Sequence, residues 1–177
     1  EQLFGRLYYI GMYVLAGLMG SVLSSYLSIR DGYELLQHFD RLAGLQSSLI
    51  PHISAGASGA VMGLGAVLTV ISLFPPLPQQ RFWLDKKSLL MVMAINLVFG
   101  FTVAGINNAA HIGGMMMGAL LAGAWYLGEK IQKPALIQIG ALIIGTVLLA
   151  AFYFYCTELS TGLDPLWNEI LRQNQLS

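Results

Sequence analysis

Charged residues are scarce in this sequence. Asp, Glu, Lys and Arg make up 10% of its 177 residues, whereas soluble domains carry about 25%. The formal net charge is zero, so nothing in the composition argues for nucleic acid as a partner. The single cysteine, Cys156, excludes an internal disulfide and a cysteine-based metal site. Apolar residues make up 56% of the chain, which indicates an integral membrane protein built from helices, because helices satisfy their own backbone hydrogen bonds in lipid.

Long runs without a charged residue predict the membrane spans. Residues 88–128 lack charge over about twice the ~20 residues that one crossing needs, so two spans joined by a turn at 104–108 are predicted there. Pro75 ends the preceding span, because proline cannot continue the helical hydrogen-bond ladder. The spans are predicted at residues 7–27, 57–74, twice within 88–128, and at 135–155. The predicted fold is therefore an all-α polytopic membrane bundle with about five transmembrane helices.

Two polar segments lie outside these spans. In residues 28–53 apolar positions recur at helical spacing beside charged ones, which predicts an amphipathic helix at the membrane surface. An ordinary loop helix packed on the bundle is the alternative. The apolar positions are Tyr33, Leu36, Phe39 and Leu42. After the fifth span, Asp164 and Pro165 predict the start of a short helix at residues 167–171.

The lysines predict the orientation of the chain. They fall in the loops after the second and fourth spans, which lie on the same side of the membrane. The positive-inside rule makes that side cytoplasmic. The lysines are Lys86, Lys87, Lys130 and Lys133. Residues 28–53, the turn at 104–108 and the C-terminal tail are then expected on the outer side.

Two polar residues near the outer ends of spans are candidates for chemistry. His111 lies just inside the fourth span, where ionisable side chains are costly and often functional. A structural histidine, hydrogen-bonded to a neighbouring backbone or hydroxyl group, is the alternative. Ser58 lies among small residues at the start of the second span, and close helix packing through those residues is the alternative there.

Topology predicts that Ser58 and His111 lie at similar depth, because the second and fourth spans are separated by one crossing and run parallel. Glycines beside both residues permit the close approach that a serine–imidazole hydrogen bond of about 2.6–3.2 Å needs. They are Gly56, Gly59 and Gly63 on one span and Gly113, Gly114 and Gly118 on the other. An imidazole can take the hydroxyl proton and return it to the leaving amine. No acidic residue lies in a span near His111, so a Ser/His dyad is predicted, with the imidazole held by packing or by a backbone group.

The start of the second span also offers donors for an oxyanion. The first amide groups of a helix have no intrahelical partner, so the N–H groups of Ser58 and Ala57 are the candidates. His52 with Ser54 is a rival pair, but it lies close to the aqueous loop and lacks the paired-helix geometry. His38 is interpreted as a surface residue.

Two motifs resemble those of the rhomboid family of intramembrane serine proteases. Gly56, Ala57, Ser58 and Gly59 are similar to its G-x-S-G nucleophile motif, and residues 108–114 are similar to its A-H-x-x-G histidine motif. The resemblance implies that the chain consists of three parts. Residues 1–128 would form the catalytic core without the family's first two helices, which are expected as part of the complete fold. Residues 129–157 would form a cytoplasmic loop and an additional transmembrane helix, and residues 158–177 an extracytoplasmic tail.

The resemblance further implies a serine endopeptidase that cleaves transmembrane protein substrates in or near their membrane segments, within the lipid bilayer and without metal or cofactor. It implies location in a bacterial inner membrane, with the active site toward the extracytoplasmic side. Residues expected to support the substrate site or its packing are Gly56, Gly59, Met62, Asn108 and Gly114. Met62 stands where many members have an aromatic residue against the imidazole, and a thioether also packs on a ring. The alternative is a noncatalytic rhomboid-like protein that binds membrane clients.

Overall fold

The chain folds into a bundle of helices. The computed structural model describes residues 3–37, 57–77, 84–103, 105–165 and 168. Within those ranges it contains α1 (Arg6–Gln37), α2 (Ala57–Leu73), α3 (Lys86–Thr102), α4 (Asn108–Lys130) and α5 (Pro134–Thr161). Three of these helices, α1, α4 and α5, are long and apolar enough to cross a membrane, and α2 is a shorter apolar helix. The predicted all-α class is confirmed.

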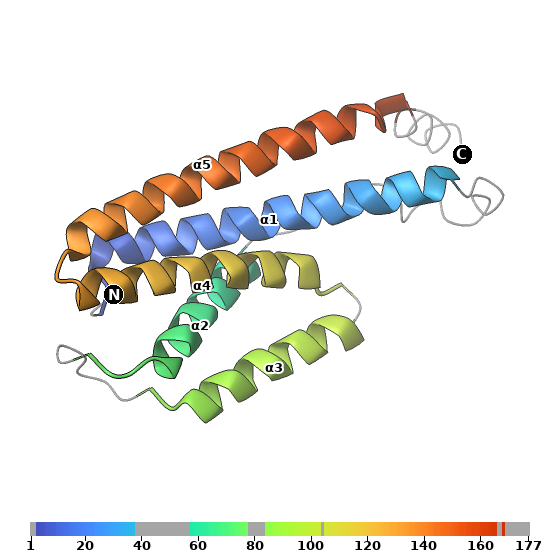
Figure 1. Cartoon of the computed structure of the whole chain (residues 1–177). Helices are drawn as coiled ribbons and strands as arrows, with labels where there is room; N and C mark the ends of the chain where they lie inside the picture. The colour runs from blue at the N-terminus through green and yellow to red at the C-terminus, as the bar shows by residue number, and fades with distance from the viewer. Residues whose placement is uncertain (1–2, 38–56, 78–83, 104, 166–167, 169–177) are drawn as a thin grey trace.

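The bundle is centred on α1, α2 and α4, which share its main core (Figure 1). This core contains Met12 and Ala16 of α1, Val67 of α2 and Leu121 of α4, all almost fully buried. α5 lies along α1, on the side of the bundle away from α3. α3 is peripheral, because Met93 is its one buried residue. The centre of the fold is therefore the three helices that carry the residues singled out in the sequence.

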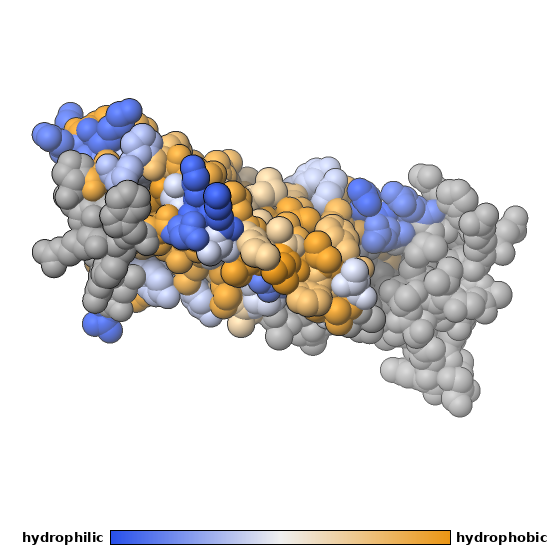
Figure 2. Space-filling view, turned by 90° about the horizontal axis from the view of Figure 1, so that it is seen from below, coloured by the Kyte–Doolittle hydropathy of each residue, from blue (hydrophilic) through white to orange (hydrophobic). Residues whose placement is uncertain are grey.

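The outer surface of the bundle is apolar. Figure 2 shows hydrophobic side chains along the middle of the molecule and hydrophilic ones mainly toward its two ends. Leu136, Ile143 and Phe154 of α5 are examples of large apolar side chains that are largely exposed. A continuous exposed apolar surface of this kind is costly in water and is expected where lipid chains surround a protein.

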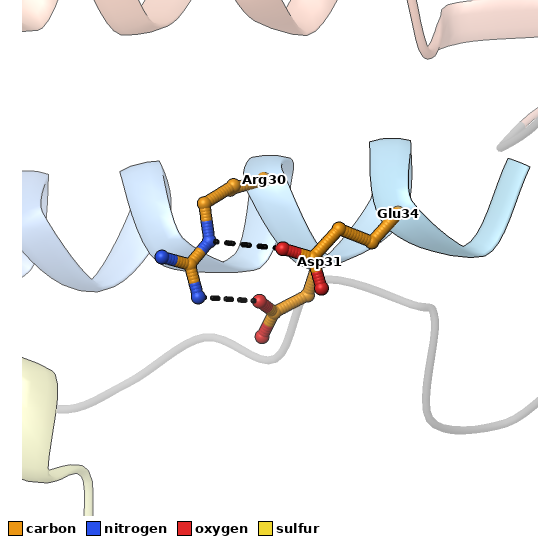
Figure 3. Close-up of polar contacts among 3 residues, drawn as sticks. All are labelled: Arg30, Asp31 and Glu34. Atoms are coloured by element: carbon orange, nitrogen blue, oxygen red, sulfur yellow. Dashed lines mark hydrogen bonds and ion pairs between the residues drawn. The ribbon is translucent and has the colours of Figure 1, made fainter. Parts of the chain in front are cut away.

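α1 corrects one sequence prediction. The charged residues after position 27 predict the end of the first span and a separate surface helix, but α1 continues without a break to Gln37. Arg30 lies 3.5 Å from Asp31 and 3.6 Å from Glu34, one turn ahead on the same helix (Figure 3). A helix of 32 residues is about 48 Å long, which exceeds the ~30 Å hydrocarbon layer. The rest of the predicted surface helix, including Phe39 and Leu42, lies outside the described residues.

The last turns of α1 pack against the last turns of α5. Ile29, Cys156 and Leu163 form a small buried cluster between them, and Tyr33 donates a 2.8 Å hydrogen bond to the carbonyl oxygen of Leu159. α5 therefore runs farther than the predicted residues 135–155. The predicted helix at 167–171 falls largely outside the described residues.

Replacing Tyr33 by phenylalanine should lower the free energy of unfolding by about 1 kcal/mol, because the variant loses the hydrogen bond to Leu159 and keeps the ring. Thermal unfolding in detergent measures this change. Tyr153→Phe is the matched control, since Tyr153 is 56% exposed on α5. Equal melting temperatures for the two variants would show that the Tyr33 bond does not help to hold α5 on α1.

Candidate functional site

Glycines bring α2 and α4 into backbone contact. A Cβ atom added at Gly63 would lie 2.8 Å from the carbonyl oxygen of Gly114, and one added at Gly59 would lie 2.9 Å from that of Ala110. Added Cβ atoms at Gly114 and Gly118 would collide with the carbonyl oxygens of α2 itself. Real Cβ atoms do not approach other atoms so closely, so these positions accept only glycine without movement of a helix. The expected close approach of the two helices is therefore present.

The same contacts fix the register of α2 on α4. Gly59 lies against Ala110 and Gly114, and one turn later Gly63 lies against Gly114 and Gly118. The two helices thus run parallel. Because Gly59 contacts both Ala110 and Gly114, position 59 of α2 lies level with position 112 of α4, midway between them. The offset is 112 − 59 = 53, and the same offset sets position 58 level with position 111.

Ser58 lies in the first turn of α2, and both Ser58 and Ala57 are exposed. Their amide groups are among the first four of the helix, which have no intrahelical acceptor. A small nucleophile beside backbone donors that lack an intrahelical acceptor is thus open to an approaching molecule. Gly56, the other small residue of this motif, lies outside the described residues, as does the rival pair His52 and Ser54.

His111 lies in the first turn of α4 and is 7% exposed. Its Nδ1 atom is buried and has no hydrogen-bond partner in the described part of the chain. Within the described residues, no hydrogen bond joins the imidazole to Ser58. Met62, expected beside the ring, clusters with Ala66 and Met93, and Met115 packs against this cluster.

Two asparagines hold the start of α4, and the sequence predicts a role in the site for only one of them, Asn108. Asn107 caps the helix by accepting a 3.0 Å hydrogen bond from the amide of Ala110, and it donates to the hydroxyl of Ser24 on α1. An asparagine directly before an apolar helix is a recognisable capping signal. Asn108, which was expected to support the site, donates a 3.4 Å hydrogen bond to the carbonyl oxygen of Leu97 on α3. The start of α4 is thus tied to both α1 and α3.

The described residues contain no group of three or more His, Cys, Asp or Glu side chains that could hold a metal ion. Groups that could take part in chemistry at this end of α2 and α4 are the hydroxyl of Ser58, the imidazole of His111 and the amide side chain of Asn108. This set can perform proton transfer and nucleophilic attack.

Comparisons with known proteins agree on one family. The family model described as Rhomboid domain matches residues 1–130. The chain is 31% identical over 154 residues to Rhomboid protease GluP of Bacillus subtilis (strain 168), covering 85% of this chain and 24% of that protein. It is 29% identical over 163 residues to Rhomboid protease AarA of Providencia stuartii, covering 88% of this chain and 55% of that protein.

A plant relative, RHOMBOID-like protein 4 of Arabidopsis thaliana, is 32% identical over 122 residues, covering 68% of this chain and 25% of that protein. The chain thus spans between about a quarter and about half of the length of these three relatives. No solved structure matches it significantly. The apolar helices agree with the family match in indicating an integral membrane protein. Because the family model covers most of the sequence, the chain belongs to the rhomboid family.

Proposed function

We propose that this chain carries the catalytic core of an intramembrane serine endopeptidase, with Ser58 as nucleophile and His111 as general base. The observation that carries the proposal is the glycine register of α2 on α4, whose offset of 53 relates position 58 to position 111. The names of two relatives, which are rhomboid proteases, support the same activity. Ser58 is exposed and His111 is buried, as expected of a nucleophile that meets substrate and a base that is held in place.

The proposed reaction has two halves. The Ser58 hydroxyl attacks the carbonyl carbon of the scissile peptide bond while His111 takes its proton, and a tetrahedral oxyanion forms. The C–N bond then breaks and His111 returns the proton to the leaving amine, which leaves an acyl ester on Ser58. Water attacks the ester with His111 again as base, and the hydroxyl of Ser58 is restored. The proposed reaction uses no redox partner and no cofactor.

The oxyanion requires donors that point to where negative charge develops. The amides of Ser58 and Ala57 are suited to this role, because they begin α2 and the positive end of the helix dipole lies there. The exposure of Ala57 and Ser58 leaves room for a substrate backbone beside the hydroxyl. In a site with little water, such preorganised donors contribute more than they would in bulk solvent.

The proposed substrates are membrane proteins whose peptide bonds are cleaved in or beside a transmembrane segment. The described lysines support a cytoplasmic location for the opposite end of the bundle, because they lie at the end of α4 and at the starts of α3 and α5. The proposed site then faces the extracytoplasmic side, in a bacterial inner membrane. Within the chain, residues 1–128 are proposed as the catalytic core, residues 129–157 as a loop and additional helix, and residues 158–177 as an outer tail.

Labelling with a fluorophosphonate probe in detergent tests the proposal, because such probes bond covalently to activated serines. We expect labelling of the full-length protein to disappear in the Ser58→Ala variant. Ser72→Ala is the matched control on α2, since the Ser72 hydroxyl donates to the carbonyl of Thr69 within its own helix. If the folded protein shows no labelling at Ser58, the proposal is wrong and a noncatalytic client-binding protein is favoured.

A further inference from the structure

Two buried polar atoms at the start of α4 have no hydrogen-bond partner among the residues that the structure describes. They are the Nδ1 atom of His111 and the Oδ1 atom of Asn108. Leaving a buried polar group unpaired is costly, and native proteins rarely tolerate it without a bridging water or a functional reason. Two such atoms within one helical turn therefore need a common explanation.

The two atoms are chemically complementary. The Asn108 amide nitrogen donates to the carbonyl of Leu97, which identifies the unpaired Oδ1 atom as the acceptor oxygen. The Nδ1 atom of an imidazole donates when it carries the ring proton. Side chains three residues apart on a helix are neighbours, with Cβ atoms about 5–6 Å apart. Side chains that are neighbours in this way can be joined by one water molecule with two hydrogen bonds, and polar sites of this kind hold buried water.

The Asn108 side chain is also held from the side of α3. A Cβ atom added at Gly100 would collide with the Asn108 Oδ1 atom, so α3 carries a glycine where this amide lies. Together with the hydrogen bond to Leu97, this contact restricts the rotation of the amide. Asn108 is thus in a position to orient a neighbour.

A general base at His111 needs its proton on Nδ1, so that Nε2 can accept from the serine. Which ring nitrogen carries the proton is determined by the hydrogen bond that the other one makes. α4 has no carboxylate near its start, since Glu129 lies at its far end. We infer that Asn108 is the positioning residue of the proposed dyad: its Oδ1 atom accepts the Nδ1 proton of His111 through one bridging water, and this fixes the tautomer of the ring. The inference rests on the proposed function.

The tautomer can be measured without any reaction, from the ¹⁵N shifts of the imidazole in detergent. A background with His38→Gln and His52→Gln leaves His111 as the one histidine of the chain. We expect a single Nδ1–H form there, and a rise of at least about fivefold in the Nε2–H population in Asn108→Ala. Asn107→Ala is the matched control, because it removes the neighbouring amide and the helix cap. An unchanged tautomer in Asn108→Ala, or an equal change in Asn107→Ala, would overturn the inference.

Labelling of Ser58 supplies the second readout. We expect Asn108→Ala to slow labelling by about tenfold or more, since a base in the wrong tautomer is ineffective. Asn108→Asp keeps an acceptor oxygen near the positive end of the helix dipole but loses the amide that donates to the carbonyl of Leu97, so it should keep mainly the Nδ1–H form and a labelling rate above that of Asn108→Ala. A predominant Nε2–H form in folded Asn108→Asp would contradict the inference even if the alanine variant does not fold. A fixed tautomer without any labelling of Ser58 would overturn the proposed function and leave the positioning role intact.

Discussion

Ser58→Ala and His111→Gln should each reduce cleavage of a transmembrane substrate by at least about a thousandfold, and the double variant should be no slower than either single one. A nucleophile and its base act as one unit, so removing the second partner has no further effect once the first is gone. Two residues with separate structural roles would instead show losses that add. The non-additivity is therefore the most specific result that the proposed dyad predicts.

The measurement is the rate of cleavage in proteoliposomes, with the full-length protein and a membrane substrate that the parent cleaves. Melting temperatures of all variants show whether they are folded. His111→Gln keeps a polar side chain of similar length, which limits the damage to packing around a position that is 7% exposed. If the double variant is slower than both single variants by a further factor of ten, Ser58 and His111 do not act as a pair.

The boundaries of the second and fourth helices could be predicted well from the sequence, because lipid penalises charge strongly and uniformly. The second span was expected at residues 57–74 and α2 covers Ala57–Leu73. The charged residues after Gly128 predict the end of the fourth span, and α4 ends at Lys130. The second and fourth spans are predicted to run parallel because one membrane crossing separates them. The contacts of Gly59 and Gly63 with α4 show that α2 and α4 run parallel.

The course of α1 could not be predicted in the same way. A charge such as Arg30 signals where lipid ends, but it does not end a helix. Arg30 and Glu34, spaced one turn apart, form an ion pair that is compatible with a continuing helix. The partner of Tyr33 lies on α5, 126 residues along the chain, so no local pattern reveals it.

The surroundings of the candidate site depend on similarly distant contacts. The sequence predicts a thioether at Met62 near the imidazole, but it cannot tell that Met93 of α3 joins the same cluster. It also cannot reveal that Asn108 reaches the carbonyl of Leu97 and leaves its own oxygen unpaired. These details arise from how α3 lies on α2 and α4, which apolar periodicity does not specify.

Gly114→Ala should lower the free energy of unfolding by about 3 kcal/mol, the upper part of the range for one extra methyl group in a packed core. The reason is that the new Cβ atom would collide with the carbonyl oxygen of Gly59, a backbone atom that cannot rotate away. Gly123→Ala is the matched control on the same helix, because nothing lies within 4 Å of its added Cβ atom. Alanine favours a helix over glycine by up to about 1 kcal/mol, so the control should be neutral or stabilised.

The same substitution tests how Ser58 is positioned. To accept the methyl group, α2 must move away from α4, and Ser58 moves with it because it directly precedes Gly59. A misplacement of about 1 Å between reacting groups costs about a hundredfold in rate, so labelling of the folded fraction should fall by that order. Unfolding in detergent and probe labelling below the melting temperature separate the two effects. A destabilised Gly114→Ala protein that is labelled at the parent rate would show that the glycine contact holds the bundle together but does not position Ser58, whereas a melting temperature equal to that of Gly123→Ala would show that α2 and α4 can separate at little cost.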